Sequence, residues 1–488
     1  MTYPGTGLSR PAHRWTSAID GPRLRDLRRQ QGLTREQLAS RDQSRPGWIF
    51  GGGPATVVTM SPEPRAAPGA AVPPPDPAAA PVSTAPGAAA PGARAGRSRI
   101  RFAGLGYALT VLLTGTNLAT PLYATYQRVF GLTPLDVTLL VAVYAAAVVV
   151  ALLICGPLSD TAGYRPVLIA GLVAAACGAA LLAAASGPGW LFAGRAVQGL
   201  AVGTCSGALT AGLVLTEPSG RRARASFLAA TATTAACGAG PVLAGALAQF
   251  APAPRALSYL VEISLLIPAL AAAAMLPASL GASGGRWRPR WPRPPAAIRG
   301  EFLLPAVVSL LAWAVAYVVL ALVPSYAAAT LGRSNLLVDG SAAGSLLLVA
   351  AAAQAACRRW DAGRAQAAGL LGLTAGLLGL IAAGRLGSAT VLFAAMAIAG
   401  GGQGLAFMGG VRRINEIAPA DGHAGTVAMF YVVTYTGSGL VTAGVGLLAT
   451  HLGLSVAVQL SGAVLAAACL VTLAAARHRG IRGAAAAR

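Results

Sequence analysis

Long apolar stretches recur from about residue 102 to the end of the chain, separated by short polar connections. Each stretch spans roughly 20 residues, the length that a helix needs to cross about 30 Å of hydrocarbon. Because lipid offers no hydrogen bonds to an open backbone, these stretches are predicted to be helices. The twelve predicted helices cover residues 105–124, 136–156, 166–186, 190–215, 225–249, 256–280, 301–328, 337–356, 365–384, 388–409, 424–448 and 452–476.

The composition agrees with a membrane protein. Of the 488 residues, 55% are hydrophobic and 11% are charged. Such a balance leaves too little polar surface for a water-soluble protein of this length. The predicted fold class is therefore an all-α membrane protein with twelve transmembrane helices.

The formal net charge of +22 would favour a nucleic-acid partner in a soluble protein, so the position of the charge decides its meaning. The chain has no lysine, and its connections alternate between rich and poor in arginine. The rich connections hold Arg165, Arg221, Arg222, Arg224, Arg286, Arg288, Arg290, Arg293, Arg299, Arg358, Arg359, Arg364, Arg412 and Arg413, and the poor ones hold Arg128, Arg255, Arg333 and Arg385. By the positive-inside rule the rich set is cytoplasmic, so both termini are expected in the cytoplasm and no nucleic acid is expected as partner.

Composition also divides the chain into five parts. These are a tail at 1–101, a six-helix bundle at 102–280, a basic linker at 281–300, a second six-helix bundle at 301–477 and a short tail at 478–488. The first tail contains a Pro/Ala/Gly run that should be disordered. Residues 24–41 resemble the opening of a helix-turn-helix, but the glycines and prolines that follow forbid a recognition helix. A start at Met60 would make residues 1–59 an upstream artefact.

Cysteine and histidine are scattered. The six cysteines lie in or beside apolar helices without CxxC spacing, which is typical of small packed side chains. Four dispersed histidines form no recognisable ligand set, so no metal site and no cofactor are expected.

The turn between the second and third predicted helices reads GPLSDTAGYR. Gly156 and Gly163 permit a tight turn with close approach of the helices. Asp160 precedes the positive N-terminal end of the third helix, and Arg165 is a nearby countercharge. Taken by itself, the pattern also fits an ordinary charged turn.

Two more motifs follow in helices four and five. Helix four contains LFAGRAVQG, with Arg195 inside an apolar segment. A buried arginine costs at least about 2.5 kcal/mol on insertion scales, so Arg195 should face a polar cavity or a partner unless it snorkels. Helix five contains GAGPVLAG, where Pro241 removes a backbone hydrogen bond while Gly240 and Gly245 allow close packing. Simple packing of small residues would give the same pattern.

Together the three motifs resemble the signatures of the major facilitator superfamily, and the third is similar to the motif of its twelve-helix drug:proton antiporters. The turn matches G-x-L-x-D-x-x-G-R-R except at Tyr164, where the family commonly has arginine. The resemblance implies two pseudo-symmetric halves that alternate access to a midplane site. It also implies that Asp160 and Arg165 belong to a charge network that holds the halves together when the carrier opens outward.

The second half carries related features. The loop between helices eight and nine reads RRWDAGR, a degenerate copy of the turn in which Asp361 and Arg364 are the counterpart gating residues. Residues 192–218 align without a gap on residues 393–419. The charge of Arg195 has no counterpart there, so it belongs to one half only.

If the resemblance holds, helices one, four, seven and ten line the central path. Their polar and aromatic residues are the candidates for substrate contact: Asn117, Tyr123, Tyr126, Arg195, Gln198, Trp313, Tyr317 and Gln403. Each could equally be an interface anchor or an interhelical hydrogen bond.

Proton coupling needs a group that titrates within the membrane. Glu262 is the only acidic residue well inside a predicted helix, and Asp136 stands at the start of helix two. We predict that Glu262 or Asp136 exchanges protons, with Arg195 as the charge partner.

The leading hypothesis is therefore a monomeric secondary transporter of a bacterial inner membrane, which exports drugs or small hydrophobic metabolites in exchange for protons. A carrier of sugars or other small polar solutes is the alternative of the same class. A membrane-tethered DNA-binding regulator is disfavoured by the incomplete helix-turn-helix. A decayed carrier is disfavoured by three intact motifs, and an enzyme by the absence of paired catalytic groups or a phosphate loop.

Overall fold

The structure is a computed structural model, and its first feature is that all regular secondary structure in the described residues is helical. The described residues are 91–281, 295–331, 335–419 and 423–486. Within them, twelve segments are long and apolar enough to cross a membrane, which confirms the predicted fold class. The fragment 24–41 and Met60 lie outside the described residues.

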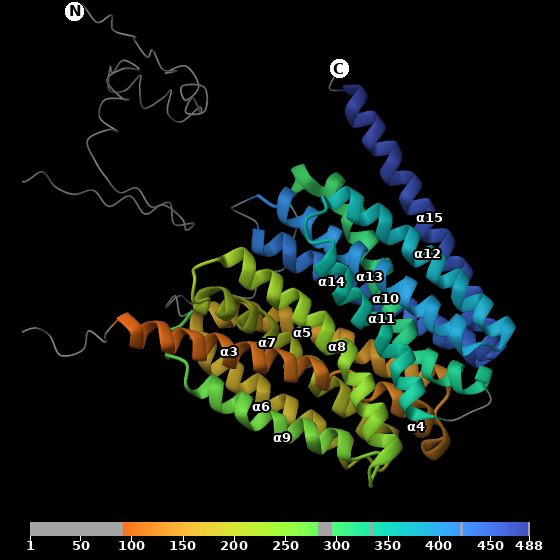
Figure 1. The fold of residues 1–488 in the computed structure, drawn as a ribbon, viewed down its shortest axis with the longest axis horizontal. Coiled ribbons are helices and arrows are strands. Elements are labelled where there is room, and N and C mark those ends of the chain that lie inside the picture. Colours follow the sequence, from red (N-terminus) through yellow and green to blue (C-terminus); the bar gives the residue numbers. More distant parts are fainter. Residues whose placement is uncertain (1–90, 282–294, 332–334, 420–422, 487–488) are drawn as a thin grey trace, which may run out of the picture. The chain divides into compact units, whose positions relative to one another are not determined.

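The first six spans form one group of packed helices, drawn from orange to green in Figure 1. The helix α7 packs against both α5 and α6, and α3 packs against α7, α8 and α9. The bounds are α3 Pro91–Gly115, η2 Thr120–Leu122, α4 Tyr123–Phe130, α5 Pro134–Ala162, α6 Tyr164–Ala183, α7 Pro188–Thr216, α8 Arg222–Phe250 and α9 Leu257–Ala274.

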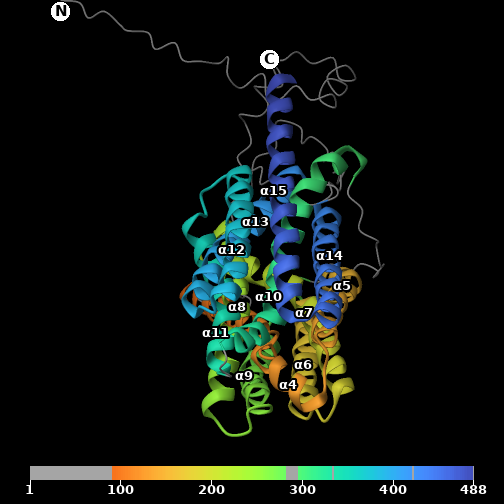
Figure 2. The same cartoon turned by 90° about the vertical axis from the view of Figure 1, so that its right-hand side faces the viewer.

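The last six spans form the second group, drawn from green to blue. The helices α12 and α13 pack closely through small residues, and α10 packs against α11, α13 and α14. The bounds are η3 Ala296–Ile298, α10 Arg299–Leu331, α11 Leu336–Ala356, α12 Ala362–Leu386, α13 Ala389–Ile417, α14 His423–Leu452 and α15 Leu454–Ala486. Figure 2 shows α15 continuing past its neighbours, beyond the end of its membrane span at His478.

The first membrane span is interrupted, whereas the sequence predicted one helix over 105–124. The helix α3 ends at Gly115, and η2 and α4 complete the crossing. The residues between are held by short i→i+3 bonds, such as that from the Leu118 N–H to the Gly115 carbonyl at 3.2 Å. Pro121 cannot donate the next helical hydrogen bond, and this explains why the α-helix does not continue.

Polar residues at the connections end and begin the helices. Thr133 and Asp136 form a reciprocal capping box at the start of α5, next to Pro134 at its first position. Asn335 accepts hydrogen bonds from two N–H groups at the start of α11. These caps satisfy backbone donors that lipid would leave unpaired.

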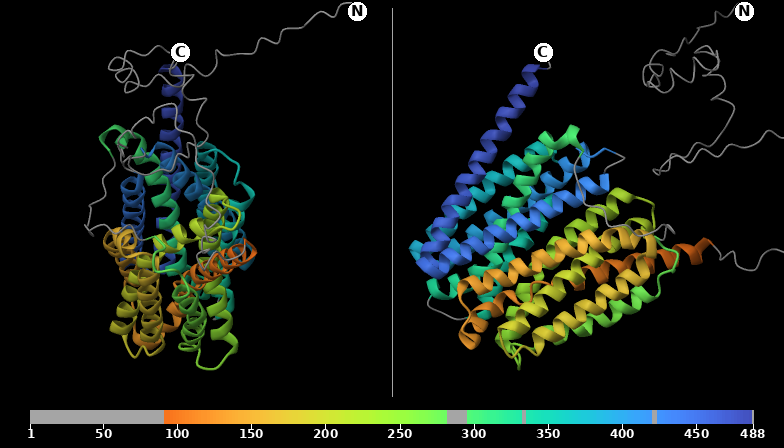
Figure 3. Two further views of the ribbon diagram at one scale, coloured as in Figure 1. Left: turned by 90° about the vertical axis from the view of Figure 1, so that its left-hand side faces the viewer. Right: turned by 180° about the vertical axis from the view of Figure 1, so that it is seen from behind.

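The two groups contact each other along α8 and α11, from Leu336 beside Gln249 at one end to Arg358 over the Phe227 ring at the other, and along α5 and α14. We call the end of the bundle where α8 ends and α11 begins the arginine-poor end, and the other the arginine-rich end. At the arginine-poor end the Leu336 N–H donates to Gln249 Oε1 at 3.0 Å, and the Leu135 N–H donates to Thr450 Oγ1 at 3.1 Å. Figure 3 (right panel) shows the helices of the two groups diverging from there.

Candidate functional site

Arg195 lies on α7, where it is 3% exposed, so its side chain does not reach the surface by snorkelling. Its Nη1 donates to the Thr116 carbonyl at 2.5 Å and to Gln198 Oε1 at 3.0 Å. The guanidinium also lies over the Tyr144 ring, 4.4 Å from its centroid. The charge is thus held at the negative end of α3, beside a carbonyl that the interruption frees from the helix.

Glu262 reaches the same turn from α9. Its side chain is 3% exposed, and Oε2 has no hydrogen-bond partner in the described part of the chain. A β-carbon at Gly115 would lie 1.8 Å from Glu262 Oε1, so the carboxylate packs directly on that glycine. The guanidinium of Arg195 acts on it electrostatically without a direct ion pair among the described contacts.

Side chains around the turn complete a polar cluster. Gln198 Nε2 donates to the Gly115 carbonyl at 3.5 Å, and Asn117 Nδ2 donates to Thr116 Oγ1 at 3.1 Å. Cys237 of α8 lies within hydrogen-bonding reach of the Thr116 and Asn117 side chains. The structure therefore brings Asn117, Arg195, Gln198 and Glu262 together, as four of the predicted site residues. We call them the central cluster.

Two other cavity candidates are buried within the first group of helices. Tyr123 and Tyr126 are 2% and 1% exposed, and the hydroxyls of Tyr126 and Tyr259 lie 3.1 Å apart. Tyr126 also stacks on Phe130. These contacts give Tyr126 an interhelical packing role.

Facing the central cluster, the second group presents a continuous row of aromatic side chains. Trp313 lies 5.6 Å from Tyr317, 5.5 Å from Phe407 and 6.0 Å from Tyr435 between ring centroids. Tyr431 extends the row by stacking on Tyr435. We call these five residues the aromatic wall. Edge-to-face and offset-stacked rings at these distances provide a broad apolar surface.

Two side chains of the second group, one of them in the aromatic wall, carry polar atoms that lack partners. The Tyr317 hydroxyl and both amide atoms of Gln403 are buried with no hydrogen-bond partner in the described residues. Tyr317 lies near Tyr144 and Arg195 of the first group. Unsatisfied buried groups are costly, so these atoms mark positions where a bound molecule could supply hydrogen bonds.

Asp136 stays apart from this cluster. Its carboxylate accepts hydrogen bonds from the Thr133 N–H at 2.8 Å and the Thr133 hydroxyl at 2.7 Å, at the arginine-poor start of α5. The structure thus gives Asp136 a capping role and does not bring it to Arg195.

The predicted gating turn joins α5 and α6 at the arginine-rich end. Gly163 has a φ of 84°, which a residue with a side chain rarely adopts, and the Tyr164 N–H donates to the Leu280 carbonyl at 2.9 Å. Arg165 is half-buried in the first turn of α6. The backbones of Gly156 and Asp160 lie in the last turns of α5, and the Asp160 side chain is outside the described part.

Its counterpart in the second half is a local helix cap. Asp361 Oδ1 accepts from the Arg364 N–H at 2.8 Å, and Arg364 lies over the Trp360 ring at 4.4 Å. The backbone hydrogen bond from Arg364 holds the pKa of Asp361 below its usual value. Asp361 and Arg364 thus act within one connection.

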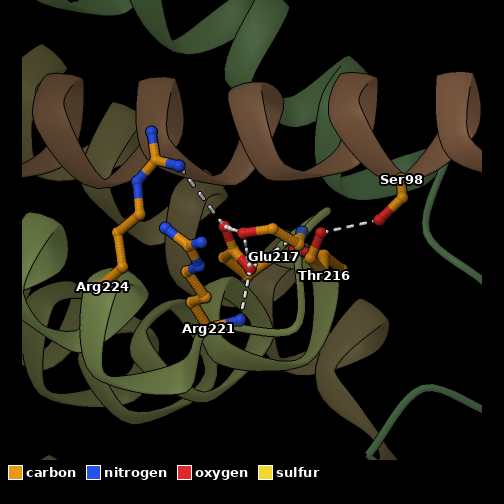
Figure 4. A network of polar contacts seen from close by, with 6 residues as sticks. Ser98, Thr216, Glu217, Arg221 and Arg224 are labelled. Carbon is orange, nitrogen blue, oxygen red and sulfur yellow. Dashed lines mark hydrogen bonds and ion pairs between the residues drawn. The ribbon is translucent and has the colours of Figure 1, made fainter.

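A second capping network, which the sequence reading missed, stands at the arginine-rich end of α7. Glu217 accepts from the Ser219 hydroxyl at 2.7 Å and from the Arg221 N–H at 2.7 Å, and Arg224 lies 4.0 Å away (Figure 4). The Ser219 hydroxyl, followed by the Arg221 and Ser219 N–H groups and the Arg224 charge, lowers the pKa of Glu217. An acid one turn before a basic helix start is the signal that could have revealed it.

The Gly-Pro motif of α8 lies at contacts between helices. A β-carbon at Gly240 would lie 2.4 Å from the Thr114 carbonyl oxygen of α3. One at Gly245 would lie 2.4 Å from the Leu336 carbonyl oxygen, and one at Gly340 of α11 would overlap the Pro241 carbonyl. The motif therefore lets α8 touch both the interrupted first span and the second group of helices.

A multi-pass membrane carrier is the class that these features define: two six-helix groups, an interrupted first span and a buried charged cluster within the first group. A sequence model described as Major Facilitator Superfamily matches residues 105–443. The chain belongs to the Major Facilitator Superfamily, as the sequence motifs indicated.

The solved structures include similar folds, and one of them is the crystal structure of a mutant of the nucleoside transporter NupG. It superposes with a TM-score of 0.60 at 12% identity, over 78% of this chain and 99% of that one. At this identity the likeness shows the fold. No curated protein matches the sequence.

Proposed function

We propose that this protein exports drugs or small hydrophobic metabolites across a bacterial inner membrane in exchange for protons. The observation that carries the proposal is the pair formed by Glu262 and Arg195, both buried and both packed on the turn at Gly115 and Thr116. A carboxylate without a hydrogen bond on Oε2 can gain or lose a proton without breaking a structural contact. Arg195 supplies a fixed countercharge for its ionised form.

The aromatic wall supports the substrate class. Five rings in contact with one another offer a large apolar surface to a hydrophobic or planar molecule, and cationic molecules gain further from ring faces. The Gly-Pro motif of α8 also supports this substrate class, because it resembles the motif of drug:proton antiporters. Our proposal takes the protein to work as a monomer.

The arrangement of the helices supports an inward-facing state in this proposal. The positive-inside rule assigns the arginine-rich end, and with it both termini, to the cytoplasm. The two groups contact each other at the opposite end through pairs such as Leu336 with Gln249. Transport would then require those contacts to open toward the outside.

A dye-accumulation assay tests the proposal. Cells expressing the chain are loaded with a panel of cationic and neutral fluorescent dyes, with and without a protonophore, beside Glu262→Gln and Asp160→Asn variants. We expect lower accumulation that disappears with the protonophore and in both variants. Retained proton-driven export in a Glu262→Gln, Asp136→Asn double variant would refute the coupling part.

A carrier of a small polar solute is the second candidate. The unpartnered Gln403 amide and Tyr317 hydroxyl favour it, because they could hydrogen-bond a polar molecule that stacks on the aromatic wall. The structurally similar NupG is a nucleoside transporter, and nucleosides combine a planar base with polar groups. Radiolabelled nucleoside and sugar uptake in the same cells, with no effect on any dye, would favour this candidate.

A further inference from the structure

A second buried carboxylate lies at the arginine-poor end, away from the central cluster. Asp339, in the first turn of α11, is 2% exposed. It lines a cavity of about 310 Å³ together with Gln127 and Arg128 of the first group and Ser325 and Leu336 of the second. The sequence reading passed over it because it stands near a predicted helix boundary.

Asp339 is surrounded by contacts that join the two groups of helices. Ser325 Oγ donates to Gln127 Oε1 at 2.8 Å, and the Leu336 N–H donates to Gln249 Oε1 at 3.0 Å. Next to Asp339, Gly340 packs on the Pro241 carbonyl of α8. We call Gln127, Gln249, Ser325, Leu336 and Asp339 the seam.

The charges that face Asp339 are few. Of the described residues on the elements around it, α4 contributes Arg128, whose guanidinium acts electrostatically on the carboxylate. The helices α8 and α10 contribute the uncharged Gln249 and Ser325, and η2 contributes only Thr120, Pro121 and Leu122. Arg128 is exposed and makes no direct ion pair with Asp339 among the described contacts.

We propose that Asp339 is a second proton-linked residue of the transport cycle, whose protonation keeps the seam closed and whose ionisation lets it open. This inference rests on the proposed alternating access, since the seam must part when the carrier opens at the arginine-poor end. Closure buries the carboxylate and opening returns it to water. An ionised carboxylate loses far more hydration on burial than a neutral acid does, so a bound proton favours the closed seam.

Arg128 weakens the dependence of seam closure on the protonation of Asp339 but does not remove it. Its positive charge compensates part of the lost hydration when Asp339 is ionised in the closed seam. Protons entering from the outside would therefore close the seam behind them, which is the order that export in exchange for protons requires. Glu262, at the central cluster, would receive or release its proton in a separate step.

Cysteine cross-linking across the seam tests the proposal. Gln127 and Ser325, whose side chains are in direct contact, are both replaced by cysteine in the full-length protein, and the rate of disulfide formation is followed at acidic and alkaline pH. Thiolate chemistry alone makes disulfides form faster at alkaline pH. We expect the opposite, a several-fold slower reaction at alkaline pH, because the seam opens.

Two variants and two controls make the result specific. Asp339→Asn should restore the ordinary alkaline acceleration, whereas Asp136→Asn, an acid at the same end, should leave the slowing intact. Arg128→Gln should deepen the alkaline slowing, and Arg255→Gln, another arginine at that end, should not. The proposal would be overturned if disulfide formation in the double-cysteine protein is faster at alkaline pH, or if it is still slowed at alkaline pH after Asp339→Asn.

The outcome is separable from that of the dye assay. Proton-driven export without a pH-dependent seam would remove the role of Asp339 and leave the proposed function standing. A pH-dependent seam that needs Asp339, in a protein that exports none of the dyes, would leave the seam and remove the proposed substrates.

Discussion

Arg195 of α7 donates a 2.5 Å hydrogen bond to the main-chain carbonyl of Thr116, at the point where the first membrane span is interrupted. The guanidinium is a charge inside an apolar segment and needs a polar partner there. The Thr116 carbonyl has lost its helical hydrogen bond and needs a donor, so the contact satisfies both groups. Each group therefore explains the other, and both lie beside Glu262. The following predictions begin from this relationship.

Replacing Glu262 with glutamine should abolish proton coupling. The amide keeps the size and position of the carboxyl at Gly115 but cannot exchange a proton at membrane depth. In proteoliposomes, substrate-driven proton movement should disappear while substrate exchange without a gradient persists. Asp136→Asn, which alters a helix cap only, should retain coupling, and equal loss in both variants would contradict the assignment.

Replacing Arg195 with methionine should destabilise the protein. The change leaves the Thr116 carbonyl without its charged donor, and an unsatisfied buried acceptor costs about 1–3 kcal/mol. Thermal unfolding in detergent should show a clearly lowered Tm. Arg385→Met, at an exposed arginine in the last turn of α12, serves as the control and should leave the Tm unchanged. Equal melting of the two variants would count against the structural role of Arg195.

Removing the Tyr317 hydroxyl should not lower the Tm, in contrast to the change at Arg195. That hydroxyl is buried without a hydrogen-bond partner, so Tyr317→Phe should keep or raise the Tm, by up to about 1 kcal/mol in stability. Substrate affinity should nevertheless change if the hydroxyl contacts the substrate. Tyr126→Phe breaks a 3.1 Å hydroxyl contact with Tyr259 and should lower the Tm instead. Matching Tm losses would show that the Tyr317 hydroxyl is satisfied.

Glu217 should make stability depend on pH. Its pKa is lowered by the Ser219 hydroxyl and the backbone N–H groups, relative to an ordinary value of 4.5. A lowered pKa means that the stabilisation is present above that value and is lost as the pH falls through the folded-state pKa. Glu217→Gln should therefore melt below the unaltered protein near neutral pH, and the difference should vanish in acid. A difference that grows in acid would reverse the assignment.

Gly245 should not tolerate alanine. A β-carbon there would lie 2.4 Å from the Leu336 carbonyl oxygen, so α8 and α11 would have to separate at the arginine-poor end. Gly245→Ala should reduce transport and the yield of folded protein. Gly207→Ala is the matched control, because open space surrounds that position and alanine favours a helix by about 1 kcal/mol. Normal transport by Gly245→Ala would show that the contact is dispensable.

Much of the fold could be predicted from the sequence because each span satisfies its own backbone. Apolar length and the spacing of arginine were sufficient to find twelve spans. The interruption after Gly115 was missed because its cause is distributed over Thr116, Asn117 and Pro121, within a stretch that is apolar enough to read as one helix. Arg195 on α7 satisfies the Thr116 carbonyl of that backbone, which no local sequence pattern reveals.

Candidate site residues could be predicted where a charged residue type is rare in membrane helices. They could not be predicted where contacts between distant helices define the site. An arginine and a glutamate inside apolar helices stand out by their cost, so Arg195 and Glu262 could be found. Asp136 was selected by the same rule, but its neighbour Thr133 makes it a helix cap. Asp339 and Phe407 belong to contacts between helices far apart in sequence, which no local pattern encodes.

The partners that hold Arg195 all come from the first group of helices: Thr116, Gln198 and Tyr144. In the proposed alternating access, one half would move against the other, and the guanidinium would move together with these three partners. The free-energy cost of burying the Arg195 charge is therefore met once, during folding, and the proposed transport cycle does not repeat it. Under that proposal the positive charge of Arg195 stays in the same surroundings while the two openings alternate.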